Sequence, residues 1–365
     1  MSAATGRLRR AERDAADRPV RVVIVDDSAL ARQLIRAMLG GDGSIEVVGS
    51  ATDPTTAADI IRTKNPDVIT LDVEMPNMDG LTFLEKIMRV KPTPVVMVSS
   101  LTERGADVTL QALELGAVDF VTKPRIDVAR GFEAKREELI GKIKAAARAR
   151  VRALSPAPPP APAAKERPKT PPVYRTTERI VAIGASTGGV EALREVICAL
   201  PSDSPATLVV QHMPGGFTQR FAQRLNGLAQ VAVVEAQDGQ RALPGHVYIA
   251  PGERHLRLTR SGAQYLCKID DDDPVCGHRP SVDVLFHSVA TEAGRNAIGV
   301  ILTGMGADGA KGLKAMREAG ARTIGQNEAS CVVYGMPKAA NALGATEVEA
   351  PIGRIARMIL ERCVG

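Results

Sequence analysis

A serine set among glycines is the first candidate for chemistry in this 365-residue chain. Gly184, Ser186 and Gly188 spell Gly-x-Ser-x-Gly, a pattern typical of a sharp strand-to-helix turn that exposes a nucleophilic hydroxyl. An apolar run precedes the serine, and a helical pattern over 190–200 follows it. The same stretch also fits a glycine-rich loop that binds a phosphate or nucleotide, so the motif alone leaves both interpretations open.

A serine nucleophile needs a base within hydrogen-bond reach and an acid that orients this base. Of the five histidines, His212 is the preferred base because it directly follows the apolar run 206–211. Asp308 is the candidate acid, since it lies between the apolar run 297–303 and a helical pattern. An Asp before a glycine is also common as a turn or N-cap residue, and spacing alone does not decide between the two roles.

The other histidines are expected elsewhere. His278 precedes a predicted helix start and is the second choice for lining the site. His287 is expected to pack within a helix, and His246 and His255 to lie at the surface of a hairpin.

A second group of reactive side chains follows apolar runs in the first half of the chain. Asp26 and Asp27 follow the first run, Asp72 the third, Ser99 the fourth and Lys123 the fifth. Carboxylates at one sheet edge repel one another unless a cation lies among them, and Mg²⁺ binds such groups. With the ion in place Asp72 could attack a phosphorus atom, while Lys123 and Ser99 bind the phosphoryl oxygens. Helix capping accounts for one of these residues but not for five at successive strand ends.

Alternating apolar runs and helical patterns must position both groups, and they predict parallel sheets covered by helices on both faces. In the first half we predict strands at 20–25, 45–51, 68–71, 95–98 and 119–121, with helices at 29–39, 55–64, 81–90, 108–115 and 132–152. In the second half we predict strands at 180–183, 206–211, 231–235, 247–250, 256–259, 297–303 and 322–325, with helices at 190–200, 217–225, 281–293, 309–319 and 352–363. The piece 243–259 is interpreted as a hairpin attached to a mostly parallel sheet.

Composition sets the domain boundaries. Residues 155–172 are dense in Pro and Ala and predict an extended linker. We therefore expect a disordered extension over 1–18, a first domain over 19–140, a charged helix and linker over 141–177, and a second domain over 178–365.

Charge and cysteine content limit the function classes. Trp is absent and aromatics are 3%, which argues against base-stacking platforms for nucleic acid, and the net charge of +5 is partly due to the tails. We find no signal-peptide pattern and no apolar run long enough to insert into a membrane, and five scattered cysteines suit a reducing compartment, so we expect a cytoplasmic protein.

The first half resembles the receiver domain of two-component response regulators. The matching residues are Asp26-Asp27-Ser28, the stretch from Asp72 to Gly80, Ser99 and Lys123-Pro124. The resemblance implies a flavodoxin-like fold with a five-stranded parallel sheet and phosphorylation of Asp72 by a histidine kinase. It also implies Mg²⁺ held by Asp26, Asp27, Asp72 and the carbonyl of Glu74. Ser99 would then be the switch hydroxyl, and Phe120 the aromatic switch residue, beside Lys123.

The second half resembles the catalytic domain of the chemotaxis protein-glutamate methylesterases. The matching stretches are 184–189, 211–213, 249–252, 278–283 and 303–309. The order serine, histidine, aspartate also argues against an ordinary α/β-hydrolase, in which the acid precedes the histidine.

This resemblance implies hydrolysis of glutamate γ-methyl esters on methyl-accepting chemotaxis receptors, and deamidation of receptor glutamines, with no cofactor for the esterase step. Ser186 would attack, His212 would take its proton, and Asp308 would hold the imidazole. Backbone N–H groups near Thr187 and Met305 are the candidate oxyanion hole. We expect the first domain to cover the catalytic crevice until Asp72 is phosphorylated.

Three other interpretations are weighed against this one. A phosphorylation-controlled module that binds a nucleotide or anion is the main alternative, and it does not require His212 and Asp308 to meet Ser186. The second half is too long for a helix-turn-helix DNA-binding module. Zinc ligation by Cys267, Cys276, His278 and His287 has poor ligand spacing.

Overall fold

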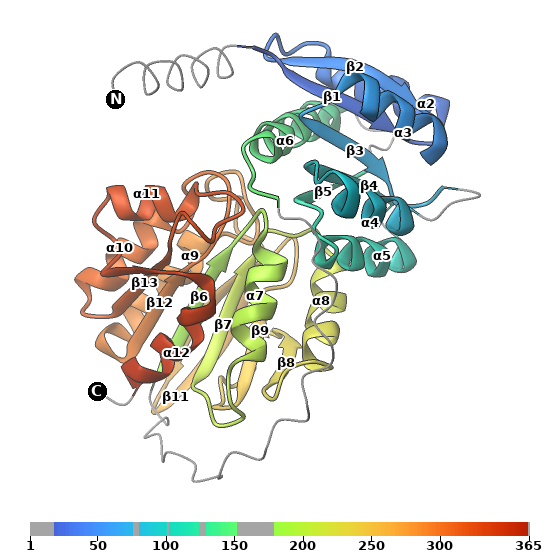
Figure 1. Ribbon diagram of the computed structural model, residues 1–365. Helices are drawn as coiled ribbons and strands as arrows, with labels where there is room; N and C mark the ends of the chain where they lie inside the picture. Colours follow the sequence, from blue (N-terminus) through green and yellow to red (C-terminus); the bar gives the residue numbers. More distant parts are fainter. Residues whose placement is uncertain (1–17, 76–79, 101, 124–128, 152–178, 364–365) are drawn as a thin grey trace, which may run out of the picture. The chain divides into compact units, whose positions relative to one another are not determined.

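The computed structural model describes residues 18–75, 80–100, 102–123, 129–151 and 179–363 (Figure 1). The predicted extension 1–18, apart from residue 18, and the predicted linker 155–172 lie outside the described residues, as do residues 76–79 and 124 of the receiver pattern. The chain divides into two compact units, one made of the described residues within 1–100 and 115–153, the other of those within 101–114 and 154–365.

A five-stranded parallel sheet forms the first unit, in the order β2-β1-β3-β4-β5. Its strands are β1 (Val20–Val25), β2 (Ile45–Ala51), β3 (Val68–Asp72), β4 (Val95–Ser99) and β5 (Asp119–Thr122). The helices that alternate with them are α2 (Ala29–Leu39), α3 (Pro54–Lys64), α4 (Gly80–Val90), α5 (Glu103–Glu114) and α6 (Ala129–Ala147). β3, β4 and β5 are buried along their whole length, as expected for strands covered on both faces. The predicted receiver fold is confirmed.

Local capping explains where these helices begin and end. Ser28 and Asp53 each accept a backbone N–H at the start of α2 and α3, as N-cap residues do. α5 begins at Glu103, five residues before the predicted start, because Thr102 Oγ1 accepts the Gly105 N–H. α6 ends at Ala147 rather than 152, where the backbone changes to tighter three-residue turns.

A seven-stranded parallel sheet forms the second unit, in the order β14-β13-β12-β6-β7-β9-β8. The strands are β6 (Ile180–Ala185), β7 (Ala206–Gln211), β8 (Ala232–Glu235), β9 (His246–Ile249), β12 (Ala297–Ile301), β13 (Arg322–Gln326) and β14 (Val348–Ala350). The helices are α7 (Gly189–Cys198), α8 (Phe217–Asn226), α9 (Val282–Glu292), α10 (Ala310–Glu318), α11 (Met336–Ala342) and α12 (Ile352–Cys363), with a short 3₁₀ helix at Gly294–Asn296. The doubly wound architecture predicted for this half is confirmed.

The hairpin lies further along the chain than predicted. β9 is not hairpin material, because it pairs in parallel with both β7 and β8 inside the main sheet. The antiparallel hairpin is β10 (His255–Ser261) with β11 (Gln264–Asp270), and Gly262 takes a positive φ of 60° at its turn. β11, β14 and α11 were missed, since β11 alternates weakly and the other two span only three and seven residues.

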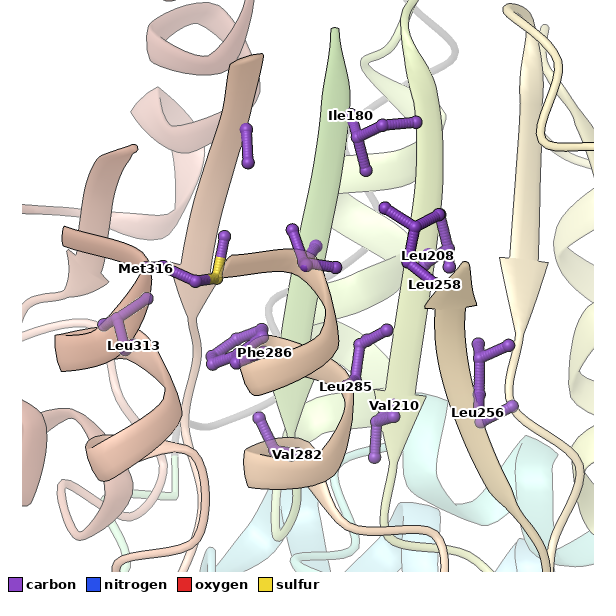
Figure 2. Packing of buried hydrophobic residues seen from close by; sticks show 14 of the residues in the cluster. Ile180, Leu208, Val210, Leu256, Leu258, Val282, Leu285, Phe286, Leu313 and Met316 are labelled. Carbon is purple, nitrogen blue, oxygen red and sulfur yellow. The ribbon is translucent and has the colours of Figure 1, made fainter. Parts of the chain in front are cut away.

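Helix α9 is the central packing element of the second unit. Figure 2 shows Val282, Leu285 and Phe286 on this helix facing Ile180, Leu208 and Val210 of the sheet, with Leu256 and Leu258 of the hairpin beside them. All are buried. This packing fixes the N-terminal end of α9.

Two glycines let that end of α9 approach the sheet closely. A Cβ on Gly184 would lie 2.2 Å from Val282 Cγ1, and a Cβ on Gly309 would lie 2.4 Å from the same atom. The first turn of α9 is therefore wedged between the carboxyl end of β6 and the loop that follows β12.

Candidate active site

The three side chains nominated as nucleophile, base and acid lie in one hydrogen-bonded line. His212 Nδ1 is 3.1 Å from Ser186 Oγ, and His212 Nε2 is 2.8 Å from Asp308 Oδ2. Each residue follows a different strand, Ser186 after β6, His212 after β7 and Asp308 in the loop after β12. Because β12, β6 and β7 are neighbours in a parallel sheet, their carboxyl ends bring the three loops to one edge.

The acid determines which imidazole nitrogen carries the proton. Burial alone would raise the pKa of Asp308, but its hydrogen bond and charge interaction with His212 and the backbone N–H groups of Asp283 and Val282 hold that pKa at about 2. An ionised carboxylate can only accept hydrogen bonds, so His212 Nε2 is the donor to it. His212 Nδ1 is then unprotonated and faces the Ser186 hydroxyl, as a general base requires.

The nucleophile sits on a tightly restrained turn. Gly188 is the N-cap of α7 and has a positive φ of 75°, and a Cβ there would lie 2.5 Å from Val332 Cβ. The Ser186 carbonyl oxygen accepts the Gly189 N–H at 2.7 Å and the Gln211 side-chain amide at 2.9 Å. These two bonds fix the peptide plane that joins Ser186 to Thr187, and therefore the direction of the Thr187 N–H.

The two oxyanion candidates belong to two loops that meet at Ser186. Thr187 follows it directly, and its carbonyl oxygen accepts the Thr303 hydroxyl at 3.0 Å. Gly304, the residue before Met305, packs so closely on the nucleophile that a Cβ there would lie 2.8 Å from Ser186 Cβ. Two backbone amides from different loops can thus approach an oxygen that develops negative charge beside Ser186.

The structure changes the interpretation of the remaining histidines. His278 stacks on the His212 ring with the centroids 3.8 Å apart, so the second choice does line the site. His255, expected at the surface, is fully buried, because it begins a strand that packs against α9. His287, expected to pack, is exposed on α9 one residue after the buried Phe286. His246 is half-buried.

Cys267 is part of the core of the second unit rather than a surface ligand. Its side chain is 0% exposed, and burial raises its pKa to about 12. A thiol in this environment resists the deprotonation that zinc ligation requires. The structure therefore gives no support to a zinc site of Cys267, Cys276, His278 and His287, whose spacing was already poor.

The first unit brings its carboxylates together at the ends of β1 and β3. One oxygen from each of Asp26, Asp27 and Asp72 lies within 4.8 Å of the others. Lys123 Nζ is 2.7 Å from Asp72 Oδ2 and 3.5 Å from Asp26 Oδ2. The Glu74 N–H donates to Asp72 Oδ1 at 3.1 Å, so the backbone at Glu74 also lies beside this cluster.

The negative charges of this cluster favour the binding of a divalent cation. Burial raises the pKa of Asp72 to about 6, and the charge of Asp26 adds to the shift while Lys123 opposes it. The pKa of Asp26 is also raised, mainly by burial. Asp26 Oδ2 is buried and accepts no hydrogen bond from the described residues. One lysine faces three clustered carboxylates, two of which have raised pKa values, and Mg²⁺ would supply the missing positive charge, so these residues fit the ion.

The two switch candidates of the first unit are both buried. Ser99 ends β4 and Phe120 lies on β5, at 0% and 3% exposure. Sequence analysis missed Lys142 of α6, whose ammonium lies 5.1 Å from the centre of the Phe120 ring and donates to the Phe120 carbonyl. Lys142 also pairs with Asp119 at 3.2 Å, so it ties α6 to the buried position of Phe120.

In the part of the chain that the structure describes, no helix combines the length and the apolar character that a bilayer span needs.

Two family models and several known proteins match this chain. Residues 22–130 match the family model for the response regulator receiver domain, and residues 181–359 match the model for CheB methylesterase. The chain is 56% identical over 346 residues to protein-glutamate methylesterase/protein-glutamine glutaminase 3 of Burkholderia lata, covering 94% of this chain and 95% of that protein. It is 57% identical over 344 residues to the protein-glutamate methylesterase/protein-glutamine glutaminase of Bordetella bronchiseptica, with coverage of 94% and 97%. The crystal structure of the Thermotoga maritima CheB methylesterase catalytic domain aligns with a TM-score of 0.49 and 39% identity, over 50% of this chain and 97% of that one.

Proposed function

The chain belongs to the family of receiver-linked protein-glutamate methylesterases and protein-glutamine glutaminases, and from this premise we propose that Ser186, His212 and Asp308 are its catalytic residues. The observation that carries the proposal is the hydrogen-bonded line from Ser186 Oγ through both imidazole nitrogens to Asp308. A module that only binds a nucleotide or anion has no need for this contact. The hydrolase is therefore favoured over the binding module.

The reaction follows from the tautomer that Asp308 imposes. His212 Nδ1 takes the hydroxyl proton as Ser186 Oγ bonds to the ester carbonyl carbon of a methylated glutamate. The N–H groups of Thr187 and Met305 stabilise the oxyanion, and such donors are worth about 3 kcal/mol each. His212 then returns the proton to the methoxy oxygen, and methanol leaves. In the second half His212 takes a proton from water, whose oxygen attacks the acyl carbon. His212 then returns this proton to Ser186 Oγ as the bond between Oγ and the acyl carbon breaks, which leaves a free glutamate. With glutamine as substrate the leaving group is ammonia.

We further propose that the substrates are methyl-accepting chemotaxis receptors and that a histidine kinase supplies the phosphoryl group for Asp72. Lys123 and Ser99 would bind its oxygens. Asp26, Asp27, Asp72 and the Glu74 carbonyl would hold Mg²⁺, which when bound supplies positive charge against the carboxylates and the phosphoryl group. Phosphorylation adds up to about two negative charges at the switch residues. All five cysteines are free, which agrees with a reaction in the reducing cytoplasm.

Methanol release from methylated receptor membranes tests both halves of the proposal. The wild-type chain and Ser186→Ala are each assayed with and without a small-molecule phosphodonor. We expect Ser186→Ala to be inactive under both conditions and the wild type to be stimulated by the phosphodonor. Activity in Ser186→Ala would remove the catalytic assignment. Full stimulation of an Asp72→Ala variant would remove the regulatory one.

A further inference from the structure

We propose that Ser281 and His255 are positioning residues of the hydrolase. They hold the Asp308 carboxylate in the orientation that it needs to orient the His212 imidazole. The inference rests on the proposed catalytic role of Asp308. It extends the line of three residues by two more, which come from the N-cap of α9 and the start of β10.

Ser281 makes direct contact with the acid. Its Oγ donates to Asp308 Oδ1 at 2.8 Å, and its side chain is fully buried. The same oxygen accepts the Val284 N–H at 3.4 Å, so Ser281 also caps α9. The cap and the carboxylate contact thus share one hydroxyl, whose proton points to Asp308 and whose lone pair points to the helix.

The carboxylate is held on all sides by donors. Oδ1 accepts from Ser281 Oγ and from the Asp283 N–H at 3.0 Å, while Oδ2 accepts from the Val282 N–H at 2.7 Å and from His212. Three of these four donors belong to the first residues of α9. The position of the α9 N-terminus therefore determines the orientation of the Asp308 carboxylate. Contacts that fix this terminus also fix the carboxylate.

His255 fixes the terminus from the other side. Its Nδ1 accepts the Ser281 N–H at 3.2 Å, and its Nε2 faces the Asp273 carbonyl oxygen at 3.1 Å. A backbone donor on one nitrogen and a backbone acceptor on the other select the imidazole with its proton on Nε2. The ring is 0% exposed, so water cannot replace it as the partner of the Ser281 N–H.

These contacts form one continuous series from a buried histidine to the nucleophile. It runs from His255 to Ser281, Asp308, His212 and Ser186, with successive separations of 3.2, 2.8, 2.8 and 3.1 Å. Each step is a hydrogen bond between groups that are buried or nearly so, where such bonds are strong and their loss is costly. A change at His255 or Ser281 is therefore transmitted to the imidazole that takes the proton.

The test measures kcat and KM for methanol release by the full chain, activated by phosphodonor. Ser281→Ala should lower kcat about tenfold with KM changed less than about twofold, as expected for loss of a hydrogen bond to a charged group. Ser281→Thr keeps the hydroxyl and should recover most of the activity. His255→Leu should resemble Ser281→Ala, whereas His255→Asn places an acceptor near the position of Nδ1 and should be less impaired.

Ser288→Ala is the matched control. Ser288 also ties α9 to β10, since its Oγ accepts the Leu258 N–H at 2.9 Å, but it has no contact with Asp308. It should lower the urea midpoint of unfolding and leave kcat unchanged. Ser281→Gly replaces Ser281→Ala if the latter does not fold, because glycine costs little at an N-cap.

A spectroscopic signature separates positioning from general stability. The far-downfield proton signal of His212 Nε2–H, bonded to Asp308, should shift or broaden in Ser281→Ala and remain in Ser288→Ala. Wild-type kcat and an unchanged signal in Ser281→Ala would overturn the inference, as would an equal loss of kcat in Ser288→Ala. If Ser186→Ala is active, the proposed function itself fails; if Ser186→Ala is inactive and Ser281→Ala is normal, only the positioning role fails.

Discussion

Replacement of Asp308 by asparagine is the sharpest test of the site, because the two side chains have almost the same shape. The carboxylate accepts four donors, two on each oxygen. An amide has one accepting oxygen and one NH₂ group that only donates. If the NH₂ group replaces Oδ2, it faces the Val282 N–H, and His212 must turn its proton toward Ser186 and cease to be a base. If it replaces Oδ1, it faces the Asp283 N–H. Neither orientation satisfies all partners.

The expected loss of stability can be worked from the pKa. The pKa of Asp308 is about 2, below the ordinary value of 3.8, and this lowering is worth on the order of 2 kcal/mol of stability at neutral pH. One unsatisfied backbone donor adds about 1–3 kcal/mol. Because the folded-state pKa is lowered, this contribution is complete above about pH 4 and is lost as the pH falls toward 2. The difference between Asp308→Asn and wild type in urea unfolding should shrink over that range.

The catalytic effect should be much larger than the effect on stability. Loss of the correct imidazole tautomer lowers kcat by about three to four orders of magnitude. Methanol release with activated enzyme measures it. Asp283→Asn is the matched control, since Asp283 is 4% exposed in the same helix turn and burial, aided by the charge of Asp308, raises its pKa. It should change kcat and the unfolding free energy little. Wild-type kcat in Asp308→Asn, or an equal loss in Asp283→Asn, would refute the reasoning.

Three further outcomes follow from the same contacts. Asp72→Asn should raise the urea midpoint of the first unit at pH 7. The folded-state pKa of Asp72 is raised to about 6, so ionised Asp72 destabilises the folded state above that pH. The difference in midpoint between the variant and the wild type should vanish below about pH 4. Mg²⁺ should raise the melting temperature of the wild type more than that of Asp26→Asn, measured by calorimetry; equal shifts would argue against the ion at this cluster. Gly304→Ala should lower the free energy of unfolding by about 1–3 kcal/mol and lower kcat more than it raises KM. The reason is that the new Cβ would lie 2.2 Å from Met336 Sδ and 2.8 Å from Ser186 Cβ. An unchanged kcat would show that this loop does not shape the site.

The positions of Ser186, His212 and Asp308 could be predicted because parallel strands end at one edge. Each of these residues directly follows, or lies close after, an apolar run, and the runs became neighbouring strands. The bounds of β1 and β7 were predicted to the residue because both strands are mostly apolar and largely buried. The bounds of β2 were also predicted to the residue, although only its two end residues are buried.

The supporting contacts could not be predicted, because they join segments that no local pattern relates. Ser281 and Asp308 are 27 residues apart, and their contact depends on how α9 packs on the sheet. His255 was placed at the surface because it was assigned to a hairpin, and the pattern of β10 does not show that α9 covers its first residue. The hairpin was displaced for a similar reason, since β9 is too short to reveal from its own residues that both of its edges are paired.

The wedge of Val282 between Gly184 and Gly309 restricts how this enzyme can vary. A methyl group added at either glycine would overlap the same valine atom, so the three positions share one fixed volume. A larger residue at 184 is tolerable only with a smaller residue at 282, whereas Gly309 has a φ of 86° and is restricted to glycine by its backbone as well. We therefore expect positions 184 and 282 to change together in directed-evolution libraries, and single substitutions at the two glycines to be eliminated even though neither glycine is a proposed catalytic residue.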